Sequence, residues 1–230
     1  MKSVLIIGSE GALGSALAVF FQSQNWHVIG FDYHDKSRHA IAYHAVDFSD
    51  SDAVKNSVDW LSAHTLTCMI STIAQFGSDN TTTFNWEEFH QKLHVNIINL
   101  SLFCVAISRV YATEQKPLKI VLVGSAAAHV GSLDIAYGIS KAGLNGLVIS
   151  LSKCFASKGI SVVGVNPGIF ESDMSTSVPS SRQEVAVQAT HIKRKGRLDE
   201  IVSVVTFAAV DSPDYLTGSI LQINGGQYSG

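Results

Sequence analysis

The sequence predicts a three-layer α/β protein in which a doubly wound parallel sheet carries helices on both faces. Short runs of β-branched residues alternate with longer amphipathic segments along all 230 residues, and this alternation is typical of strand–helix–strand units. The run Ile120–Val123 is apolar at every position, as a strand covered on both faces requires. The sequence contains no linker and no low-complexity tract, so we expect residues 1–230 to form a single domain.

Each expected strand is a short apolar run, and each expected helix is a longer segment with apolar residues at helical spacing. The expected strands are Val4–Ile7, Val28–Phe31, Ala42–Val46, Cys68–Ser71, Ile120–Gly124, Ser161–Val165 and Leu221–Ile223. The expected helices are Leu13–Gln24, Ser51–His64, Trp86–Tyr111, Ala136–Lys158 and Leu198–Val210.

Composition narrows the choice of partners and compartment. Sixteen basic against nineteen acidic side chains give a net charge of −3, which predicts neither a nucleic-acid partner nor an anionic membrane surface. No uninterrupted apolar run approaches the roughly 18 residues of a membrane-spanning helix. The three cysteines, Cys68, Cys104 and Cys154, show no CxxC spacing. We expect buried thiols in a reducing compartment, and therefore a cytoplasmic protein.

A glycine-rich turn follows the first strand and opens the first helix. Its residues are Gly8, Ser9, Glu10, Gly11, Ala12, Leu13 and Gly14. Glycines permit a tight turn and a close approach to a pyrophosphate, whose charge is favoured at a helix N-terminus. Because the turn stands between strand and helix, we expect it to bind a dinucleotide, the alternative being a purely structural turn.

Asp32 closes the second strand and bears on the choice of cofactor. A carboxylate there accepts hydrogen bonds from both hydroxyls of an adenosine ribose and repels a 2′-phosphate. Glu10 adds to this repulsion, since two like charges about 4 Å apart cost about 1 to 4 kcal/mol. Lys36 and Arg38 favour NADP instead, because a loop folded back toward the cofactor would place their positive charges near a 2′-phosphate. We expect NAD rather than NADP; the alternative is that Asp32 only caps a turn.

Further cofactor contacts are expected where later strands end. An aspartate after the third strand lies beside the adenine or is simply solvated, and small residues after the fourth strand leave room for a ribose. A Pro-Gly turn after the sixth strand frees backbone groups for the nicotinamide carboxamide, and a serine beyond it reaches the carboxamide or the pyrophosphate. These residues are Asp47, Phe48, Thr72, Ile73, Ala74, Pro167, Gly168, Ile169 and Ser172.

Tyr137 and Lys141 carry the strongest chemical signal. On a helix, positions i and i+4 share a face, and a nearby ammonium lowers the pKa of a phenol from about 10 toward working pH. Such a tyrosine exchanges a proton with a substrate oxygen. Ser125, at the end of a buried strand, supplies a hydroxyl for the same oxygen. Asn96 is a polar residue in an apolar helix, where it either anchors water leading to Lys141 or caps a helical bend.

With these motifs the chain resembles the short-chain dehydrogenase/reductase family from the glycine turn to the C-terminus. The resemblance implies a Rossmann-like fold and NAD(P)-dependent hydride transfer between nicotinamide and a small carbonyl or alcohol substrate. It also implies a homotetramer or homodimer built on helix-to-helix contacts. The motifs that match the family are the tetrad Asn96, Ser125, Tyr137 and Lys141, the turn Pro167-Gly168 and the closing Asn224-Gly225-Gly226.

The resemblance also implies roles for the tetrad. Tyr137 is the general acid in reduction, and Ser125 orients the carbonyl. Lys141 lowers the pKa of the tyrosine and binds the nicotinamide ribose, while Asn96 completes a proton relay.

The chain departs from the family pattern in three places, of which the mildest is Ser172, where threonine is common and the hydroxyl is kept. Gly8 and Gly11 enclose two residues where three are usual, and Ser71–Ala74 replaces the usual Asn-Asn-Ala-Gly.

The segment Gly11–Ser15, with Asn25-Trp26 and Asp32 downstream, looks most like dihydropteridine reductase, which lacks the tetrad serine. Reduction of a quinonoid dihydropterin is therefore one alternative function. A catalytically silent NAD-binding regulatory role is another.

The segment 173–196 is expected to be a lid that determines substrate specificity. Its basic cluster Lys193–Arg197 is either a solvated loop or a contact for an acidic or phosphopantetheine-linked substrate partner. His90 and His94 are spaced as zinc ligands can be, but no third ligand accompanies them, so we expect no metal.

The helices Trp86–Tyr111 and Ala136–Lys158 are apolar on more than one face, which predicts that a partner subunit covers part of them. The alternative is that neighbouring helices of the same chain cover them. The residues expected at that interface are Leu100, Phe103, Leu147, Leu151 and Phe155.

Overall fold

A seven-stranded sheet forms the centre of the computed structural model, which describes residues 1–77, 79–172 and 178–229. Its strand order is β3-β2-β1-β4-β5-β6-β7, and every pairing is parallel. The order reverses between β1 and β4, and ligands of such sheets bind outside the carboxyl ends of the strands at this switch point. The strands are β1 (Ser3–Ile7), β2 (His27–Asp32), β3 (Ala42–Ala45), β4 (Cys68–Ser71), β5 (Leu118–Val123), β6 (Ile160–Pro167) and β7 (Ile220–Ile223).

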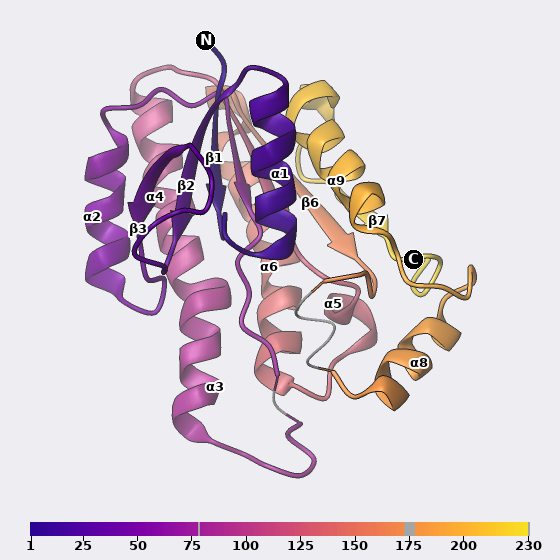
Figure 1. The fold of residues 1–230 in the computed structure, drawn as a ribbon. Coiled ribbons are helices and arrows are strands. Elements are labelled where there is room, and N and C mark those ends of the chain that lie inside the picture. The colour runs from indigo at the N-terminus through magenta and orange to yellow at the C-terminus, as the bar shows by residue number, and fades with distance from the viewer. Residues whose placement is uncertain (78, 173–177, 230) are drawn as a thin grey trace.

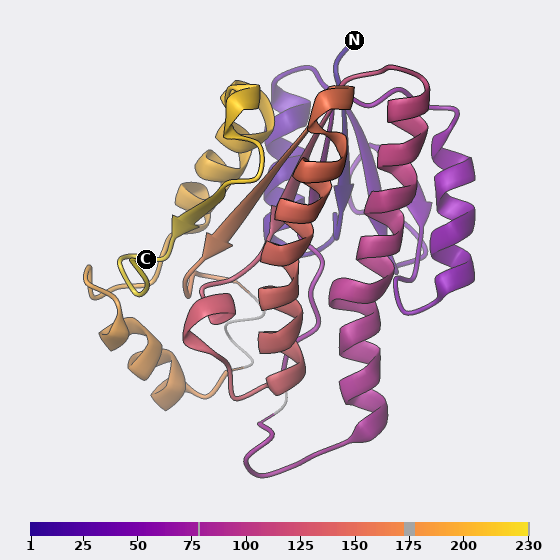
Figure 2. The ribbon, with the colours of Figure 1, turned by 180° about the vertical axis from the view of Figure 1, so that it is seen from behind.

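Helices cover both faces of the sheet. Helices α1 and α9 lie in front of it in Figure 1, and α4 and α6 lie in front of it in the reverse view of Figure 2. This arrangement confirms the predicted three-layer α/β fold and its Rossmann-like doubly wound topology. The helices are α1 (Ala12–Ser23), α2 (Ser51–Leu61), α3 (Trp86–Leu93), α4 (Asn99–Thr113), α5 (Ala127–Val130), α6 (Ile135–Phe155), α8 (Ser180–Ala189) and α9 (Leu198–Thr206).

Strand β1 shows how the apolar pattern specifies these layers. Val4 and Ile6 belong to the core cluster under α1 and α9, whereas Leu5 and Ile7 belong to the cluster under α2, α4 and α6. All four side chains are fully buried. Because successive side chains of a strand point to opposite faces, a strand that is apolar throughout needs a helical layer on each side.

The expected helix Trp86–Tyr111 is interrupted. A π-helical turn, η1 (His94–Ile98), joins α3 to α4, which ends at Thr113. A second π-helical turn, η3 (Phe207–Asp211), follows α9. Such turns insert a residue into a helix and are frequent at functional sites. Two 3₁₀ turns, η2 (Ala156–Lys158) and η4 (Asp214–Leu216), complete the secondary structure of the described residues.

Two helices were not predicted. Helix α5 has only four residues, too few for a periodic pattern to show. Helix α8 lies inside the expected lid segment 173–196, and none of its residues is buried. Its apolar residues do not form the one-sided stripe that predicts a packed helix. Residues 173–177 of the expected lid lie outside the described part of the chain.

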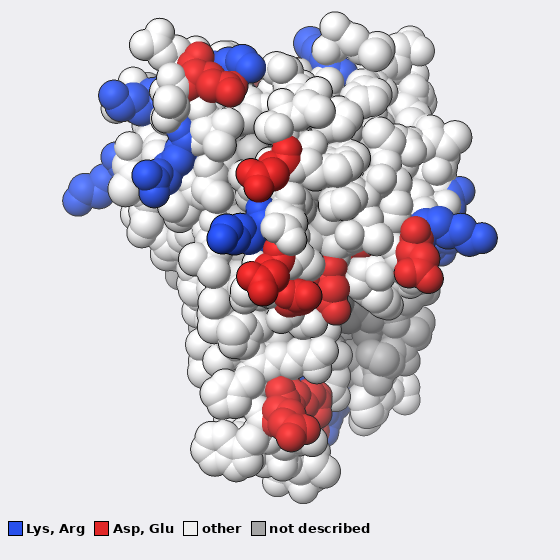
Figure 3. Space-filling model, turned by 90° about the vertical axis from the view of Figure 1, so that its left-hand side faces the viewer, with Lys and Arg blue, Asp and Glu red and all other residues white. Residues whose placement is uncertain are grey.

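The stretch Trp86–Thr113 is long and apolar enough to cross a membrane by length and composition alone. In the folded chain, Leu100, Phe103 and Ile107 from this stretch lie in the core against the sheet. A helix buried in this way meets the same criterion without any membrane. Figure 3 shows acidic and basic side chains interspersed with wide uncharged areas on the face that it presents, without a continuous basic surface.

The expectation that a partner subunit covers Leu100, Phe103 and Leu151 is wrong, because these residues are buried within their own chain. Leu147 and Phe155 pack against the same core. The sheet and the neighbouring helices supply the cover, since a helix in a three-layer fold contacts both. The exposed apolar residues of α4 and α6 are different ones, led by Leu102 (58% exposed) and Ile149 (55% exposed).

Candidate active site

The glycine-rich turn is fixed by the strands on either side of it. The N–H of Gly8 donates to the carbonyl of Phe31 at 2.8 Å, and the hydroxyl of Thr72 donates to the carbonyl of Gly8 at 3.1 Å. Gly8 has φ +85°, a conformation that favours glycine. A Cβ at Gly14 would lie 2.0 Å from the carbonyl oxygen of Gly8. Only glycine therefore lets α1 begin so close to the turn.

A cavity of about 700 Å³ lies at the carboxyl ends of the strands, against this turn. Ser9 and Ile169 do not line it: Ser9 is fully buried against Gly30, and Ile169 lines a separate cavity of about 180 Å³. The predicted residues that line the larger cavity are Gly8, Gly11, Ala12, Leu13, Gly14, Asp32, Asp47, Phe48, Thr72, Ile73, Ala74, Ser125, Tyr137, Lys141, Pro167, Gly168 and Ser172.

Asp32 ends β2 and lines this cavity. Its Oδ2 accepts the N–H of Glu10 at 3.0 Å, and its Oδ1 accepts the N–H of Tyr33 at 2.9 Å. The Nδ1 of His34 lies 2.7 Å from the same Oδ1. The carboxylate therefore holds the glycine turn and the following loop together beside the cavity. Sequence reasoning missed His34, which nothing in the local pattern distinguishes from a solvated loop residue.

Asp47 and Phe48, which follow β3, both line the cavity, but their side chains differ in burial. Asp47 is exposed and accepts the N–H of Ser49 at 2.8 Å. The ring of Phe48 is buried in the core against Phe103, with 5.8 Å between the ring centroids. Asp47 thus presents a carboxylate that also caps a turn, whereas the ring of Phe48 is a core element.

Ser125, Tyr137 and Lys141 meet at one wall of the cavity. Ser125 follows β5, and Tyr137 lies in the first turn of α6, one helical turn before Lys141. The Nζ of Lys141 donates to the carbonyl of Val123 at 3.1 Å and lies 5.7 Å from the centroid of the Tyr137 ring. The carbonyl of Ile73 accepts a longer bond from the same Nζ at 3.5 Å. The ammonium is thus held where β4 and β5 end.

Burial has the largest effect on the pKa values of Tyr137 and Lys141. It raises the pKa of Tyr137 above its ordinary value, while a hydrogen bond with Ser125 acts to lower that pKa and the carboxylate of Asp134 to raise it further. Burial also lowers the pKa of Lys141 to about 8. The expected lowering of the Tyr137 pKa is therefore not found, because desolvation of the phenol outweighs it. The phenol is protonated at neutral pH, the form that donates a proton.

Asn96 is fully buried in the π-helical turn η1 and does not line the cavity. Its Oδ1 accepts the N–H of Gln75 at 2.7 Å, and its Nδ2 donates to the carbonyl of the same residue at 2.8 Å. The Nδ2 also lies 3.2 Å from the Oγ of Ser140 on α6. Asn96 therefore ties the segment after β4 to α6 at the π-helical turn η1. Its place in a proton relay remains a prediction.

The turn after β6 is tightly packed. The N–H of Gly168 donates to the carbonyl of Ile223 at 3.0 Å, and a Cβ at Gly168 would lie 2.9 Å from the Cα of Asn224. The carbonyl of Pro167 accepts the N–H of Ala126 at 2.7 Å. These bonds join the turn to β7 and to the segment that carries the predicted catalytic serine.

Sequence reasoning missed a buried ion pair next to Tyr137. The Nζ of Lys92 lies 2.7 Å from the Oδ2 of Asp134, and both side chains are almost fully buried. The N–H of Gly77 donates to that oxygen at 3.1 Å. Asp134 is the N-cap of α6, a role for which aspartate is a common choice and which its position before a helical segment could have indicated.

The side chains of the basic cluster have partners within the described chain. Arg194 forms an ion pair with Glu200 at 2.7 Å, and Arg197 forms one with Asp199 at 3.0 Å. Both arginines are more than two-fifths exposed, so this geometry agrees with a solvated loop. Among the described residues, no group of three or more His, Cys, Asp or Glu side chains is placed to hold a metal ion.

The sequence is similar to those of known reductases. A family model described as enoyl-(acyl carrier protein) reductase matches residues 7–228. The 3-oxoacyl-(acyl-carrier-protein) reductase of Pseudomonas aeruginosa is 30% identical over 143 residues, which are 62% of this chain and 58% of that protein. The reductase of the same name from Rickettsia conorii is 26% identical over 235 residues, covering 98% of this chain and 96% of the relative.

Solved structures show the same fold. A 4-hydroxyisoleucine dehydrogenase complexed with NADH superposes with a TM-score of 0.89 at 20% identity, covering 100% of both chains. A putative 2-deoxy-d-gluconate 3-dehydrogenase from Agrobacterium tumefaciens with bound NADP gives a TM-score of 0.87 at 21% identity, covering 98% of this chain and 96% of that one. The match of the family model over nearly the whole sequence shows that this chain belongs to the short-chain dehydrogenase/reductase family of oxidoreductases.

Proposed function

We propose that this protein is an NAD-dependent oxidoreductase that transfers a hydride between nicotinamide and a small carbonyl or alcohol substrate. One observation carries the proposal: Ser125, Tyr137 and Lys141 share a cavity with the glycine turn and Asp32. A serine, a tyrosine and a lysine at one wall supply proton transfer, and the glycine turn supplies a place for a pyrophosphate.

The cavity fits a nicotinamide dinucleotide. Helix α1 begins at Ala12, and because Gly11 and Ala12 line the cavity, the positive end of the helix dipole lies at its wall. The close approach of Gly14 to Gly8 leaves no room for a Cβ between helix and turn. Asp32 stands where the adenosine ribose would lie. When bound there, the dinucleotide supplies or accepts the hydride.

The remaining steps belong to the side chains. In reduction, the phenol of Tyr137 donates its proton to the substrate oxygen, and the hydroxyl of Ser125 donates a second hydrogen bond to it. The ammonium of Lys141 stabilises the phenolate that remains. With a pKa of about 8 this ammonium is charged at neutral pH, as the role requires. The oxidation of an alcohol runs the same proton transfer in reverse.

The proposal includes an assembly and a location. Exposed Leu102 on α4 and Ile149 on α6 support a homodimer or homotetramer, because Figure 2 shows these helices side by side on one face of the sheet. Three free cysteines, of which Cys68 and Cys104 are buried, support a cytoplasmic location.

Two candidate substrate classes have specific support. The names of the acyl-carrier-protein reductases support including 3-oxoacyl thioesters among candidate substrates. The similarity of the glycine turn to dihydropteridine reductase supports including dihydropterins. A silent NAD-binding role is disfavoured, because a binding module does not need Ser125, Tyr137 and Lys141 together.

The direct test follows nicotinamide absorbance while the protein is incubated with NADH and a panel of ketones, 3-oxoacyl thioesters and quinonoid dihydropterins. Oxidation of NADH that depends on one class of substrate would support the proposal and name that class. Tight NADH binding without turnover of any class would favour the regulatory alternative.

A further inference from the structure

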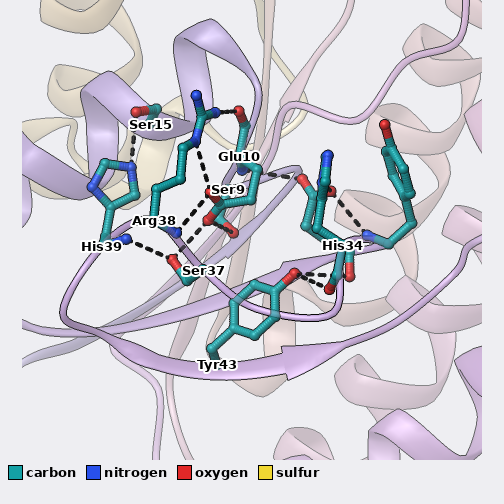
Figure 4. A network of polar contacts seen from close by, with 10 residues as sticks. Ser9, Glu10, Ser15, His34, Ser37, Arg38, His39 and Tyr43 are labelled. Carbon is teal, nitrogen blue, oxygen red and sulfur yellow. Dashed lines mark hydrogen bonds and ion pairs between the residues drawn. The ribbon is translucent and has the colours of Figure 1, made fainter.

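The carboxylate of Glu10 is held by a set of donors that reaches across from the loop after β2 (Figure 4). The hydroxyl of Ser37 donates to its Oε1 at 2.7 Å. The backbone N–H and the Nε of Arg38 both donate to its Oε2, each at 3.0 Å. A second guanidinium nitrogen of Arg38 donates to the backbone carbonyl of Glu10. One loop thus surrounds one carboxylate with a hydroxyl, an amide and a guanidinium.

These donors are the kind that binds a phosphate. Guanidinium groups and backbone amides form charge-assisted hydrogen bonds to anionic oxygens, and hydroxyl groups add to them. The side chain of Glu10 is only 2% exposed, whereas that of Arg38 is 67% exposed. Burial acts to raise the pKa of Glu10, but the hydrogen bonds from Ser37 and Arg38 hold that pKa below its ordinary value. The donors therefore hold an anion.

The loop that carries the donors is itself fixed. The N–H of His39 donates to the Oγ of Ser37 at 3.0 Å, and the ring of His39 lies 2.8 Å from the Oγ of Ser15 on α1. The hydroxyl of Tyr43 donates to the carbonyl of His34 at 2.6 Å. The donors are thus held in place by contacts with α1 and β3 as well as by Glu10.

The site adjoins the place proposed for the adenosine ribose. Glu10 and Asp32 both line the large cavity, and the backbone N–H of Glu10 donates to the Oδ2 of Asp32. A phosphate on the 2′-oxygen of a ribose bound at Asp32 would therefore reach toward the donors of Ser37 and Arg38. In the folded chain, the carboxylate of Glu10 already occupies those donors.

We propose that Ser37 and Arg38 form an anion site for the 2′-phosphate of NADP that the chain fills with its own Glu10 carboxylate. The inference rests on the proposed function, because it requires a dinucleotide in the large cavity. It changes the explanation of cofactor choice. Arg38, which by charge alone would favour NADP, is neutralised by Glu10, so the chain selects NAD by occupancy and not only by repulsion.

The test measures the dissociation constants of NADH and NADPH by calorimetry, so that it does not depend on turnover. Glu10→Ala empties the site. We expect it to move the ratio of the two constants toward NADPH by about tenfold or more, because hydrogen bonds to charged groups are worth roughly that much. Comparing this ratio between variants cancels the repulsion of the 2′-phosphate by Asp32, because all variants share it. Glu10→Ser serves as a second small variant in case the alanine variant folds poorly.

Two further variants separate occupancy from charge. Glu10→Gln removes the charge but keeps the bulk and an acceptor oxygen, so the site stays filled and we expect only a small shift of the ratio. Arg38→Ala added to Glu10→Ala removes the guanidinium donor, and we expect the ratio to return toward the wild-type value.

The outcomes distinguish this inference from the function on which it rests. An equal gain for NADPH in Glu10→Gln and Glu10→Ala would show repulsion alone and overturn the inference. The same follows if Glu10→Ala and Glu10→Ser bind NADH normally and gain nothing for NADPH. Failure of the folded wild-type protein to bind either dinucleotide would instead overturn the proposed function.

Discussion

The carboxylate of Asp134 accepts a hydrogen bond from the backbone N–H of Tyr137 at 3.2 Å. Its other oxygen pairs with the buried ammonium of Lys92 and accepts the N–H of Gly77. One carboxylate thus caps the start of α6 and fixes the segment that follows β4. The Lys92–Asp134 ion pair therefore affects Tyr137 in two ways. Asp134 holds the backbone of Tyr137, and its charge acts to raise the pKa of the phenol.

Replacing Lys92 with Met should destabilise the protein by about 3 to 5 kcal/mol, because it leaves a buried carboxylate without its cation. Urea denaturation measures this loss. The double variant Lys92→Met with Asp134→Asn removes both charges and should recover part of it. A loss in the single variant below about 1 kcal/mol would show that the pair does not hold the helix.

Lys141 should give wild-type stability a distinctive pH dependence. Its pKa falls from an ordinary value of 10.5 to about 8 in the folded protein. Between these values the unfolded chain binds a proton that the folded chain does not, so stability rises with pH. Relative to Lys141→Met, the wild type should gain up to about 3 kcal/mol from pH 8 to pH 10.5, and nothing further below pH 8. Parallel denaturation curves across this range would contradict the shift.

Gly14→Ala tests the glycine turn. The new Cβ would meet the backbone of Gly8 at 2.0 Å, so turn and helix must separate and NADH should bind at least about tenfold more weakly. Gly146→Ala is the matched control, since a Cβ there meets nothing within 4 Å. In the interior of α6 that change should stabilise the protein by about 0.5 to 1 kcal/mol. Unchanged NADH affinity in Gly14→Ala would argue against a pyrophosphate at the turn.

Leu102→Glu tests the proposed assembly. Light scattering on a size-exclusion column should give the wild type a mass of two or four times 24.7 kDa. The variant should have a lower mass, because an unpaired charge in an apolar interface is costly. Val19→Glu on α1 is the control, since Val19 is 55% exposed on the opposite face of the sheet. A wild-type mass near that of one chain would exclude the assembly.

The strands could be predicted because their signal is local. A strand buried on both faces is apolar at each position, as Val4–Ile7 and Ile120–Val123 are, and such runs fall within the observed β1 and β5. The π-helical turn at Asn96 could not be predicted in this way. In this turn Asn96 contacts Gln75 and Ser140, which lie 21 and 44 positions away in the sequence, so no local pattern reports it.

The candidate site shows the same division. The glycine spacing and the i, i+4 pair Tyr137 and Lys141 predicted one shared site, and nearly all of the predicted residues line one cavity. The ion pairs and pKa shifts of the site could not be predicted from the sequence, because they depend on residues that only the fold brings together. Glu10 and Arg38 are 28 positions apart and form an ion pair. From the sequence alone, Glu10 favours NAD and Arg38 favours NADP, but in the structure each charge is balanced by the other. The direction of the Tyr137 pKa likewise depends on burial, which only the fold determines.

The central claim is that the phenol of Tyr137 is the proton donor, and the turnover of Tyr137→Phe tests it most directly. With NADH and a substrate from the active class, kcat should fall by at least about a hundredfold, while the dissociation constant of NADH stays within about threefold of the wild-type value. That combination would separate the proton transfer from cofactor binding. Near-normal turnover in a folded Tyr137→Phe variant would contradict the account.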